Sequence, residues 1–309
     1  MRNRKVIILL SPQVIDFGLL GDTQQNIKVN KMNVLSIDVE DWYSSSIDLF
    51  SNDGAKHGQK PHPSVVTNTL RTLDLFSETK NTGTFFFLGT VAEHYPDLVK
   101  ETIRRGHEVG CHSYAHQLVY NMTKDEFIAD VEKAMTFLSK AGASNVKGFR
   151  APYWSITEQS LWALDLLREM GFAYDSSIFP IRRGLYGIPS AQRFPHRRNG
   201  LWEFPPATVR VAGVNLPVAG GGYLRILPYA LISMSINCTA NRQYKTFYFH
   251  PYELDAEDVV VQKKMRSIKS LTYYLQQVIG RGSNPDKIRR LMVDNDFTSF
   301  ENIIPRLEE

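Results

Sequence analysis

Cysteine is scarce in this chain: its 309 residues include only two, Cys111 and Cys238. They lie far apart, Cys111 in an apolar run and Cys238 in an apolar, helix-like segment. Two cysteines provide no disulfide framework, so nothing in the sequence demands an oxidising compartment. We expect two buried, reduced thiols.

Long apolar runs are also missing. No stretch approaches the ~20 apolar residues of a membrane-spanning helix. The N-terminus, MRNRKVIILLSPQ, is basic, but its apolar run VIILL is short of the roughly 7–15 residues of a secretory core. The sequence therefore predicts a cytoplasmic protein without a transmembrane segment, leaving room only for peripheral membrane contact. Residues 1–31 are expected to be an extension of doubtful structure, and residues 32–309 the main domain.

Charge of one sign is not in excess either: 36 basic residues face 32 acidic ones, a formal net charge of +4. There is no long Lys/Arg run and no aromatic-basic repeat of the kind that follows a nucleic-acid backbone. We therefore expect no nucleic-acid partner.

Short apolar runs alternate with amphipathic stretches from residue 33 onward, a pattern typical of parallel strands joined by crossover helices. The segment 123–142 is the clearest helix, with Thr123 as N-cap, Glu126 at the capping-box position and Gly142 at its end. Strands are expected at 34–39, 84–89 and 245–255, and helices over 64–78, 96–106, 156–171 and 261–280. The sequence predicts a single α/β domain, a distorted or incomplete (β/α) barrel.

Unusual polar residues follow the predicted strands. In a parallel α/β barrel the loops at the carboxyl ends of the strands meet at one rim, so these side chains are expected to lie together there. They are Asp38, Glu40 and Asp41 after the first strand, then His112, His116, Arg150, Asp175 and His250.

The stretch HSYAH places His112 and His116 four positions apart, about one helical turn. Two imidazoles and a carboxylate are a common ligand set for catalytic zinc, which keeps one position open for water. A nearby carboxylate can act as general base, a histidine as general acid and an arginine as the partner that keeps the base ionised. This combination predicts hydrolysis of an ester or amide. A glutamate would follow the first histidine in the common metalloprotease motif, and here that residue is Ser113.

Four segments, in order, resemble the motifs of the polysaccharide deacetylase family, also called NodB-homology domains or carbohydrate esterase family four. SIDVED resembles its acidic motif, HSYAH its metal-binding motif, RAPYW its arginine motif and FYFHP its last, histidine-bearing motif. The resemblance covers residues 33–254.

The resemblance implies a seven-stranded TIM-like barrel and a hydrolase of carbon–nitrogen bonds other than peptide bonds, which removes acetyl groups from sugars with a divalent metal, usually zinc. His112 and His116 would be metal ligands, Arg150 would orient the base, and the Tyr153 N–H would help to form the oxyanion hole. His250 would protonate the leaving amine.

The resemblance also implies a pocket for the acetyl methyl group. Its walls would include Tyr248, Trp202 and Trp154.

The acidic motif departs from the adjacent Asp-Asp that is usual in the family. Asp38 aligns with the catalytic base, which leaves Glu40 or Asp41 as the metal carboxylate. Alternation along a strand puts residues 38 and 40 on one face, which favours Glu40. Asp41 remains the second choice if the strand has ended by then.

The opening SIDVEDW, the closing HPYELD and the C-terminal helices look most like the branch found in bacterial exopolysaccharide and lipopolysaccharide gene clusters. The expected partner is a glycan: a polysaccharide, an oligosaccharide or a lipid-linked precursor. Two alternatives stay open. One is an amide or cyclic-imide hydrolase for a small non-sugar molecule, and the other is a non-catalytic carbohydrate-binding protein.

Overall fold

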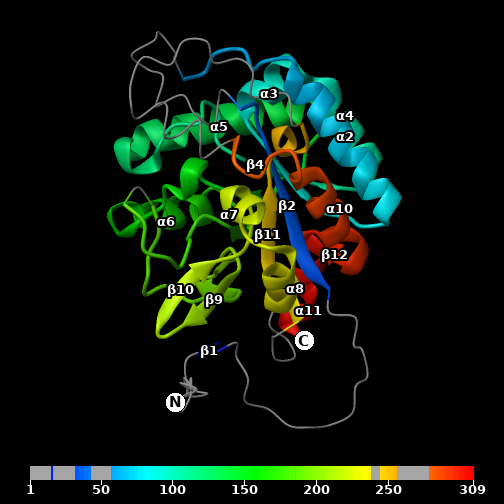
Figure 1. The fold of residues 1–309 in the computed structure, drawn as a ribbon. Helices are drawn as coiled ribbons and strands as arrows, with labels where there is room; N and C mark the ends of the chain where they lie inside the picture. Colours follow the sequence, from blue (N-terminus) through cyan, green and yellow to red (C-terminus); the bar gives the residue numbers. More distant parts are fainter. Residues whose placement is uncertain (1–14, 17–31, 43–56, 185, 238–243, 256–277) are drawn as a thin grey trace, which may run out of the picture.

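The structure is a computed structural model that describes residues 15–16, 32–42, 57–184, 186–237, 244–255 and 278–309. A curled sheet lies at its centre, with helices around it (Figure 1). Seven parallel strands follow one another across this sheet: β11 (Thr246–Phe249), β2 (Asn33–Val39), β3 (Thr84–Phe87), β4 (Glu108–Cys111), β5 (Gly148–Phe149), β6 (Tyr174–Asp175) and β8 (Leu201–Glu203). An antiparallel strand, β7 (His196–Arg198), extends the β8 edge, and β12 (Phe297–Thr298) pairs with β2.

The two ends of the sheet meet through main-chain contacts. Parallel bridges join Pro206 to Thr246 and Gly220 to Tyr248, so the segment after β8 lies beside β11. Gly220 is required at this contact, because a Cβ there would lie 1.7 Å from the Tyr248 carbonyl oxygen. The predicted single-domain, incomplete barrel is confirmed.

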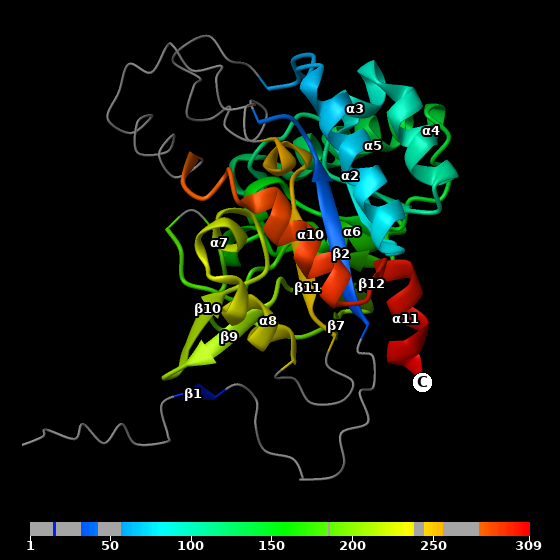
Figure 2. The same cartoon turned by 45° about the vertical axis from the view of Figure 1, so that its right-hand side comes forward.

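The helices cover the outer face of the sheet. Figure 2 shows α2 (Ser64–Thr79), α3 (Gly89–His94), α4 (Pro96–Arg104) and α5 (Lys124–Lys140) gathered on one side. On the other side lie α7 (Gly221–Ile226), α8 (Tyr229–Asn237) and the hairpin of β9 (Thr208–Val211) and β10 (Val214–Pro217). Leu35, Ile37 and Val39 of β2 belong to the large hydrophobic cluster beneath the helices. Strand alternation therefore turns Asp38 and Glu40 into the curl of the sheet.

The helix ends agree with the sequence in one case and differ in another. The capping box of α5 is present, with the Thr123 hydroxyl accepting from the Glu126 N–H, as predicted. The helix predicted over 156–171 begins later, as α6 (Trp162–Glu169). Thr157 instead caps a short 3-10 turn, η5 (Glu158–Ser160), which takes up the first residues.

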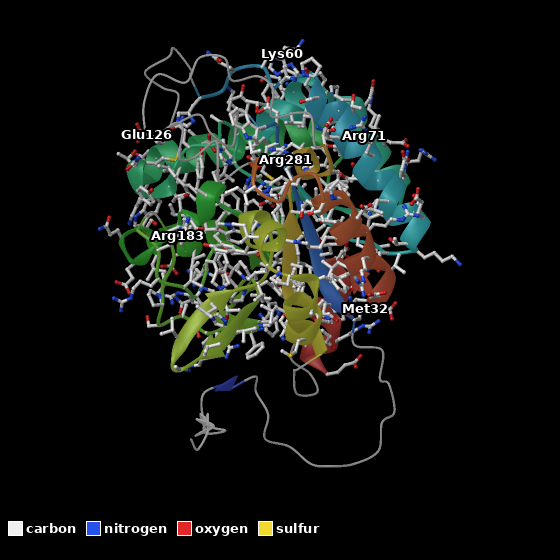
Figure 3. The ribbon with its side chains drawn as sticks, viewed as in Figure 1. Met32, Lys60, Arg71, Glu126, Arg183 and Arg281 are labelled. Carbon is white, nitrogen blue, oxygen red and sulfur yellow. The ribbon has the colours of Figure 1, made fainter. Side chains whose placement is uncertain are left out.

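The end of the sheet where the strands begin is closed by a second hydrophobic cluster. Phe300 and Ile303 of α11 (Phe300–Glu308) pack there with Phe86, Tyr174 and other aromatic or aliphatic side chains. Met32, labelled in Figure 3, marks this end, where the chain enters β2. The helix α10 (Asn284–Asp294) precedes β12 and α11 along the chain.

Several predictions concern residues outside the described part of the chain. Cys111 is buried and free, as expected, whereas Cys238 lies outside the described residues. Most of the predicted helix 261–280 and of residues 1–31 lies outside them too, except that β1 (Ile15–Asp16) pairs with β9. No helix among the described residues combines the length and the apolar character needed to span a membrane.

Candidate active site

The carboxyl ends of β2, β4, β5 and β11 bring six side chains to one rim of the barrel. Asp38 and Glu40 come from the end of β2, and His112 follows β4 directly. The other three are His116, Arg150 after β5 and His250 after β11. Five of the six are at most 4% exposed, and the His250 side chain is 17% exposed. The rim predicted from the sequence is therefore assembled, and almost no solvent screens its charges.

Glu40, His112 and His116 form the one group with metal-ligand geometry found among the described residues. The Oε2 atom of Glu40 lies 2.7 Å from His116 Nε2 and 4.0 Å from His112 Nε2. Each residue offers a donor atom within 4.8 Å of the other two, and all three side chains are buried. Two imidazole nitrogens and one carboxylate oxygen are a donor set that suits a divalent cation such as zinc.

The protonation of His112 also fits a ligand role. Its Nδ1 lies 2.7 Å from the Arg150 carbonyl oxygen, so Nδ1 carries the proton and donates it. Burial lowers the pKa of His112 to about 4, although Asp38 and Glu40 oppose that shift. The ring is therefore neutral near pH 7, and its Nε2 lone pair faces Glu40.

The segment HSYAH is a loop after β4, although its spacing would also suit a helical turn. Ser113 and His116 have left-handed φ angles of 67° and 58°, which L residues adopt at a cost. Asp130 of α5 holds the loop by accepting the N–H groups of Tyr114 (2.8 Å) and Ala115 (3.2 Å). The two histidine rings still meet, with centroids 5.5 Å apart.

Asp38 is paired with Arg150, which has no exposed surface. Arg150 Nη1 donates to Asp38 Oδ1 at 2.6 Å, and its other nitrogens donate to the carbonyl (3.2 Å) and hydroxyl (2.9 Å) oxygens of Ser176. The guanidinium lies over the Phe86 ring at 4.4 Å. Burial raises the pKa of Asp38, but Arg150 and the neighbouring histidines more than offset this and hold it below its usual value. Asp38 is thus an ionised carboxylate with a fixed orientation.

His250 lies between the two carboxylates. Its Nε2 is 3.4 Å from Glu40 Oε1 and 3.9 Å from Asp38 Oδ2. Burial lowers the pKa of His250, while Glu253 and the two carboxylates raise it, so that the net shift is upward. A histidine held in this way can carry a proton to an atom bound between it and Asp38.

Two family models match the chain. The first, described as polysaccharide deacetylase, matches residues 52–174, which include HSYAH and RAPYW. Over these residues the chain is similar to the polysaccharide deacetylase family. The second model, a domain of unknown function (DUF3473), matches residues 176–305, which include His250.

Named relatives are similar to parts of this chain. The chain is 33% identical over 98 residues to a peptidoglycan-N-acetylglucosamine deacetylase of Bacillus cereus, covering 31% of this chain and 36% of that protein. It is 30% identical over 82 residues to chitin deacetylase 1 of Saccharomyces cerevisiae, covering 26% and 27%. The chain therefore spans about a third of the length of the curated relatives it matches. A crystal structure from Mycobacterium smegmatis, assigned to the polysaccharide deacetylases, has the same fold, with a TM-score of 0.55, 18% identity and coverage of 89% and 91%.

Of the aromatic residues predicted near the pocket, some lie at the rim and one does not. The rings of Trp154 and Tyr248 lie 4.9 Å apart, and Arg150 lies 4.6 Å from the Trp154 ring. Tyr153, which has a left-handed φ of 53°, lies with its ring 4.6 Å from that of His116. These three residues border the rim.

The prediction that Trp202 lines the pocket is wrong, because Trp202 lies at the closed end of the barrel. Its ring is 4.7 Å from the Arg197 guanidinium, and its Nε1 donates to Glu308 Oε1 at 3.4 Å. Trp202 pairs with Tyr174 in the sheet and packs with the cluster beneath α11. Its place in β8, one residue before Glu203, turns it toward α11.

Asp41 stays outside the group formed by Glu40 and the two histidines. Its Oδ2 accepts a hydrogen bond from the His62 N–H, which ties the end of β2 to the segment before α2. The strand β2 ends at Val39, yet Glu40 still turns inward beside Asp38.

Three residues at the site were missed by the sequence analysis. Ser176 binds the Arg150 guanidinium, and Glu253 and Arg225 lie behind His250. A signal for Glu253 was present, since HPYE spaces a carboxylate three residues after a turn-starting residue, as a capping box does.

Proposed function

We propose that this protein is a metal-dependent hydrolase that removes acetyl groups, foremost N-acetyl groups of N-acetylhexosamine units, from a bacterial surface glycan or its precursor. One observation carries the proposal: the Glu40–His112–His116 group faces an ionised Asp38 with His250 between them. The proteins named above as peptidoglycan and chitin deacetylases support the choice of substrate class.

The ionised carboxylate of Asp38 serves as general base. Arg150 holds the carboxylate in one orientation and is itself fixed by Ser176. The base is therefore preorganised for proton transfer. A base that accepts a proton from water while fixed in this way contributes roughly 10²–10⁴ to the rate.

His250 serves as general acid. It is close enough to Asp38 for both to contact one acetamide group, and its raised pKa favours the protonated form. It gives its proton to the nitrogen as the carbon–nitrogen bond breaks, so the leaving group is a neutral amine.

Glu40, His112 and His116 would hold the divalent cation, for which we propose zinc. A cation bound there would polarise the acetyl carbonyl and make water a better nucleophile. Trp154 and Tyr248 border the same rim and would contact the acetyl methyl group. The resemblance to the exopolysaccharide and lipopolysaccharide branch adds lipid-linked precursors to the substrates worth testing.

The test is acetate release from N-acetylhexosamine oligosaccharides, peptidoglycan fragments and lipid-linked precursors, with and without a chelator. We expect release from at least one glycan, loss of release after chelation and recovery on adding zinc. A panel of small amides and cyclic imides runs in parallel. Turnover of those compounds alone would instead support the small-molecule hydrolase, and binding without any turnover would support the carbohydrate-binding protein.

A further inference from the structure

His250 begins a tight turn whose last residues lie deep in the protein. The turn, η6 (Pro251–Leu254), follows β11, and Glu253 within it has no exposed surface. We propose that Glu253, anchored by Arg225, is a positioning residue that holds the His250 ring for proton transfer. The segment 176–305, matched by a domain of unknown function, would thereby complete the centre that the deacetylase segment begins. The catalytic part of this inference rests on the proposed function.

Glu253 contacts His250 at two points. Its Oε2 accepts the His250 main-chain N–H at 3.0 Å and lies 3.3 Å from the ring Nδ1. A carboxylate can only accept, so the proton of this contact sits on Nδ1. The ring then presents Nε2 to Asp38 and Glu40, the side on which a substrate would be bound.

The second oxygen of Glu253 is occupied by an arginine. Oε1 accepts from Arg225 Nη1 at 2.9 Å, and both side chains are at most 3% exposed. Burial raises the pKa of Glu253, but His250 and Arg225 outweigh it and lower the pKa to about 2. Glu253 is therefore ionised near neutral pH, and it offers His250 a negative charge of fixed position.

Arg225 is itself held by α10. Lys287 donates to the carbonyl oxygens of Leu224 (3.0 Å), Arg225 (2.7 Å) and Leu227 (2.9 Å), which ties α7 to α10. Gly280, with a left-handed φ of 75°, allows the close approach, since a Cβ there would lie 2.7 Å from the Arg225 carbonyl oxygen. The anchor is thus fixed at both its main chain and its side chain.

The turn η6 is fastened by the same region. Arg281, labelled in Figure 3, donates to the carbonyl oxygens of Tyr252 (2.5 Å) and Asp255 (3.0 Å) from just before α10. The Tyr252 ring stacks on the His250 ring at 4.9 Å with an interplanar angle of 15°. The position of His250 therefore depends on α7, on α10 and on its own turn, all of which lie within residues 176–305.

A buried ion pair could instead be purely structural, and the experiment must separate the two roles. The variant is Glu253→Gln, which keeps the shape and removes the charge. If Glu253 acts through His250, kcat for acetate release falls on the order of 10- to 100-fold, a part of the roughly 10²–10⁴-fold that proton transfer contributes. KM and bound zinc stay unchanged. Glu108→Gln, a partly buried glutamate at the closed end of the barrel, is the matched control and keeps the wild-type kcat.

A double-mutant cycle makes the test specific. In a His250→Ala background, adding Glu253→Gln should change kcat by less than about two-fold, because the group through which it acts is gone. An equal loss in both backgrounds would overturn the proposal, as would an unchanged kcat in the single variant.

Nitrogen NMR of labelled histidine gives a readout that does not depend on turnover. Wild type should show the His250 signals of a ring protonated at Nδ1, identified by their loss in His250→Ala, and Glu253→Gln should lose that pattern. Unchanged ring signals would overturn the positioning role even if no substrate is found. Absence of acetate release with the NMR change present would count against the proposed function alone. Glu253→Asp, which keeps the charge, repeats both measurements if the glutamine variant fails to fold.

Discussion

The two ends of the barrel both bury acidic groups, but they treat them differently. At the closed end, Glu108 accepts hydrogen bonds from the Thr84 hydroxyl, the Tyr174 hydroxyl and the Glu301 N–H. At the open end, the Glu40 carboxylate faces the Nε2 atoms of two histidines that are neutral in the form that binds a metal. At the closed end, the acidic group finds all these hydrogen-bond partners within the protein. At the open end, the acidic groups are arranged so that they can bind a cation and a substrate.

The carboxyl groups titrate accordingly. Burial raises the pKa of Glu108 to about 6, because its partners are neutral donors that oppose the shift only in part. Burial also raises the pKa of Asp38 and Glu40. Arg150 outweighs it at Asp38, and the histidines in their protonated form, His116 first, outweigh it at Glu40, so both pKa values fall below their usual range. Charged partners, more than depth, therefore decide which carboxyl group stays ionised.

The largest effect should come from His112→Ala at the open end. Removing one of three donors should abolish bound zinc and lower kcat/KM roughly 10³-fold or more, since a bound cation contributes several kcal/mol to the transition state. Metal analysis and acetate release measure this. His107→Gln is the control: that histidine packs against the Phe76 and Phe85 rings at the start of β4, away from the rim, and its loss should leave the zinc content unchanged. Full activity of a zinc-free His112→Ala protein would contradict the mechanism.

Asp38→Asn should keep the zinc but lower kcat roughly 10²–10⁴-fold, because the base is gone while the three donors remain. The variant should also be less stable, since Arg150 is left buried without its ionic partner. Zinc content, kcat and the unfolding midpoint are measured on one preparation. Loss of the metal would mean that Asp38 and Glu40 have exchanged roles.

Glu108→Gln tests the closed end through its pH dependence. The pKa of Glu108 is raised from 4.5 to about 6 in the folded protein, so its stabilising contribution is complete below pH 4.5 and is lost as the pH rises through about 6. Wild type should therefore lose up to about 2 kcal/mol of unfolding free energy relative to the variant between pH 4.5 and about 7. Urea unfolding across this range measures the difference, and two parallel stability curves would refute the assignment.

The smallest effect is expected for Trp202→Phe. Because Trp202 packs beneath α11, its replacement should change kcat/KM by less than about two-fold while lowering the unfolding midpoint slightly. Trp154→Phe is the matched comparison at the open end and should raise KM more. A large rise in KM for Trp202→Phe would restore the substrate role first inferred from the sequence.

Much of the fold was predictable because it depends on local patterns. The β–α alternation predicts a parallel sheet, and the placement of polar residues after strands predicts the rim that unites Asp38, Arg150 and His250. The choice of Glu40 over Asp41 also follows from strand alternation, and the structure places Glu40 with the histidines. Whether these residues hold zinc stays a prediction.

The features that the sequence did not predict depend on contacts between residues far apart in the chain, which the spacing of a local motif does not reveal. The separation of His112 and His116 is compatible with a helix, and only Asp130 of a later helix shows why a strained loop forms instead. Arg225 lies 28 positions before Glu253 in a glycine-rich segment, and no local pattern links the two. The prediction for Trp202 rests on the resemblance alone, and no local pattern shows that its ring packs beneath α11.

The pairing of β2 also affects the order in which the sheet can form. One edge of β2 pairs with β3, about 50 residues later, whereas its other edge pairs with β11, more than 200 residues away. During synthesis one edge of this apolar strand therefore stays unpaired until β11 has left the ribosome, and an unpaired edge invites association with other chains. We expect this long-range pairing to slow folding.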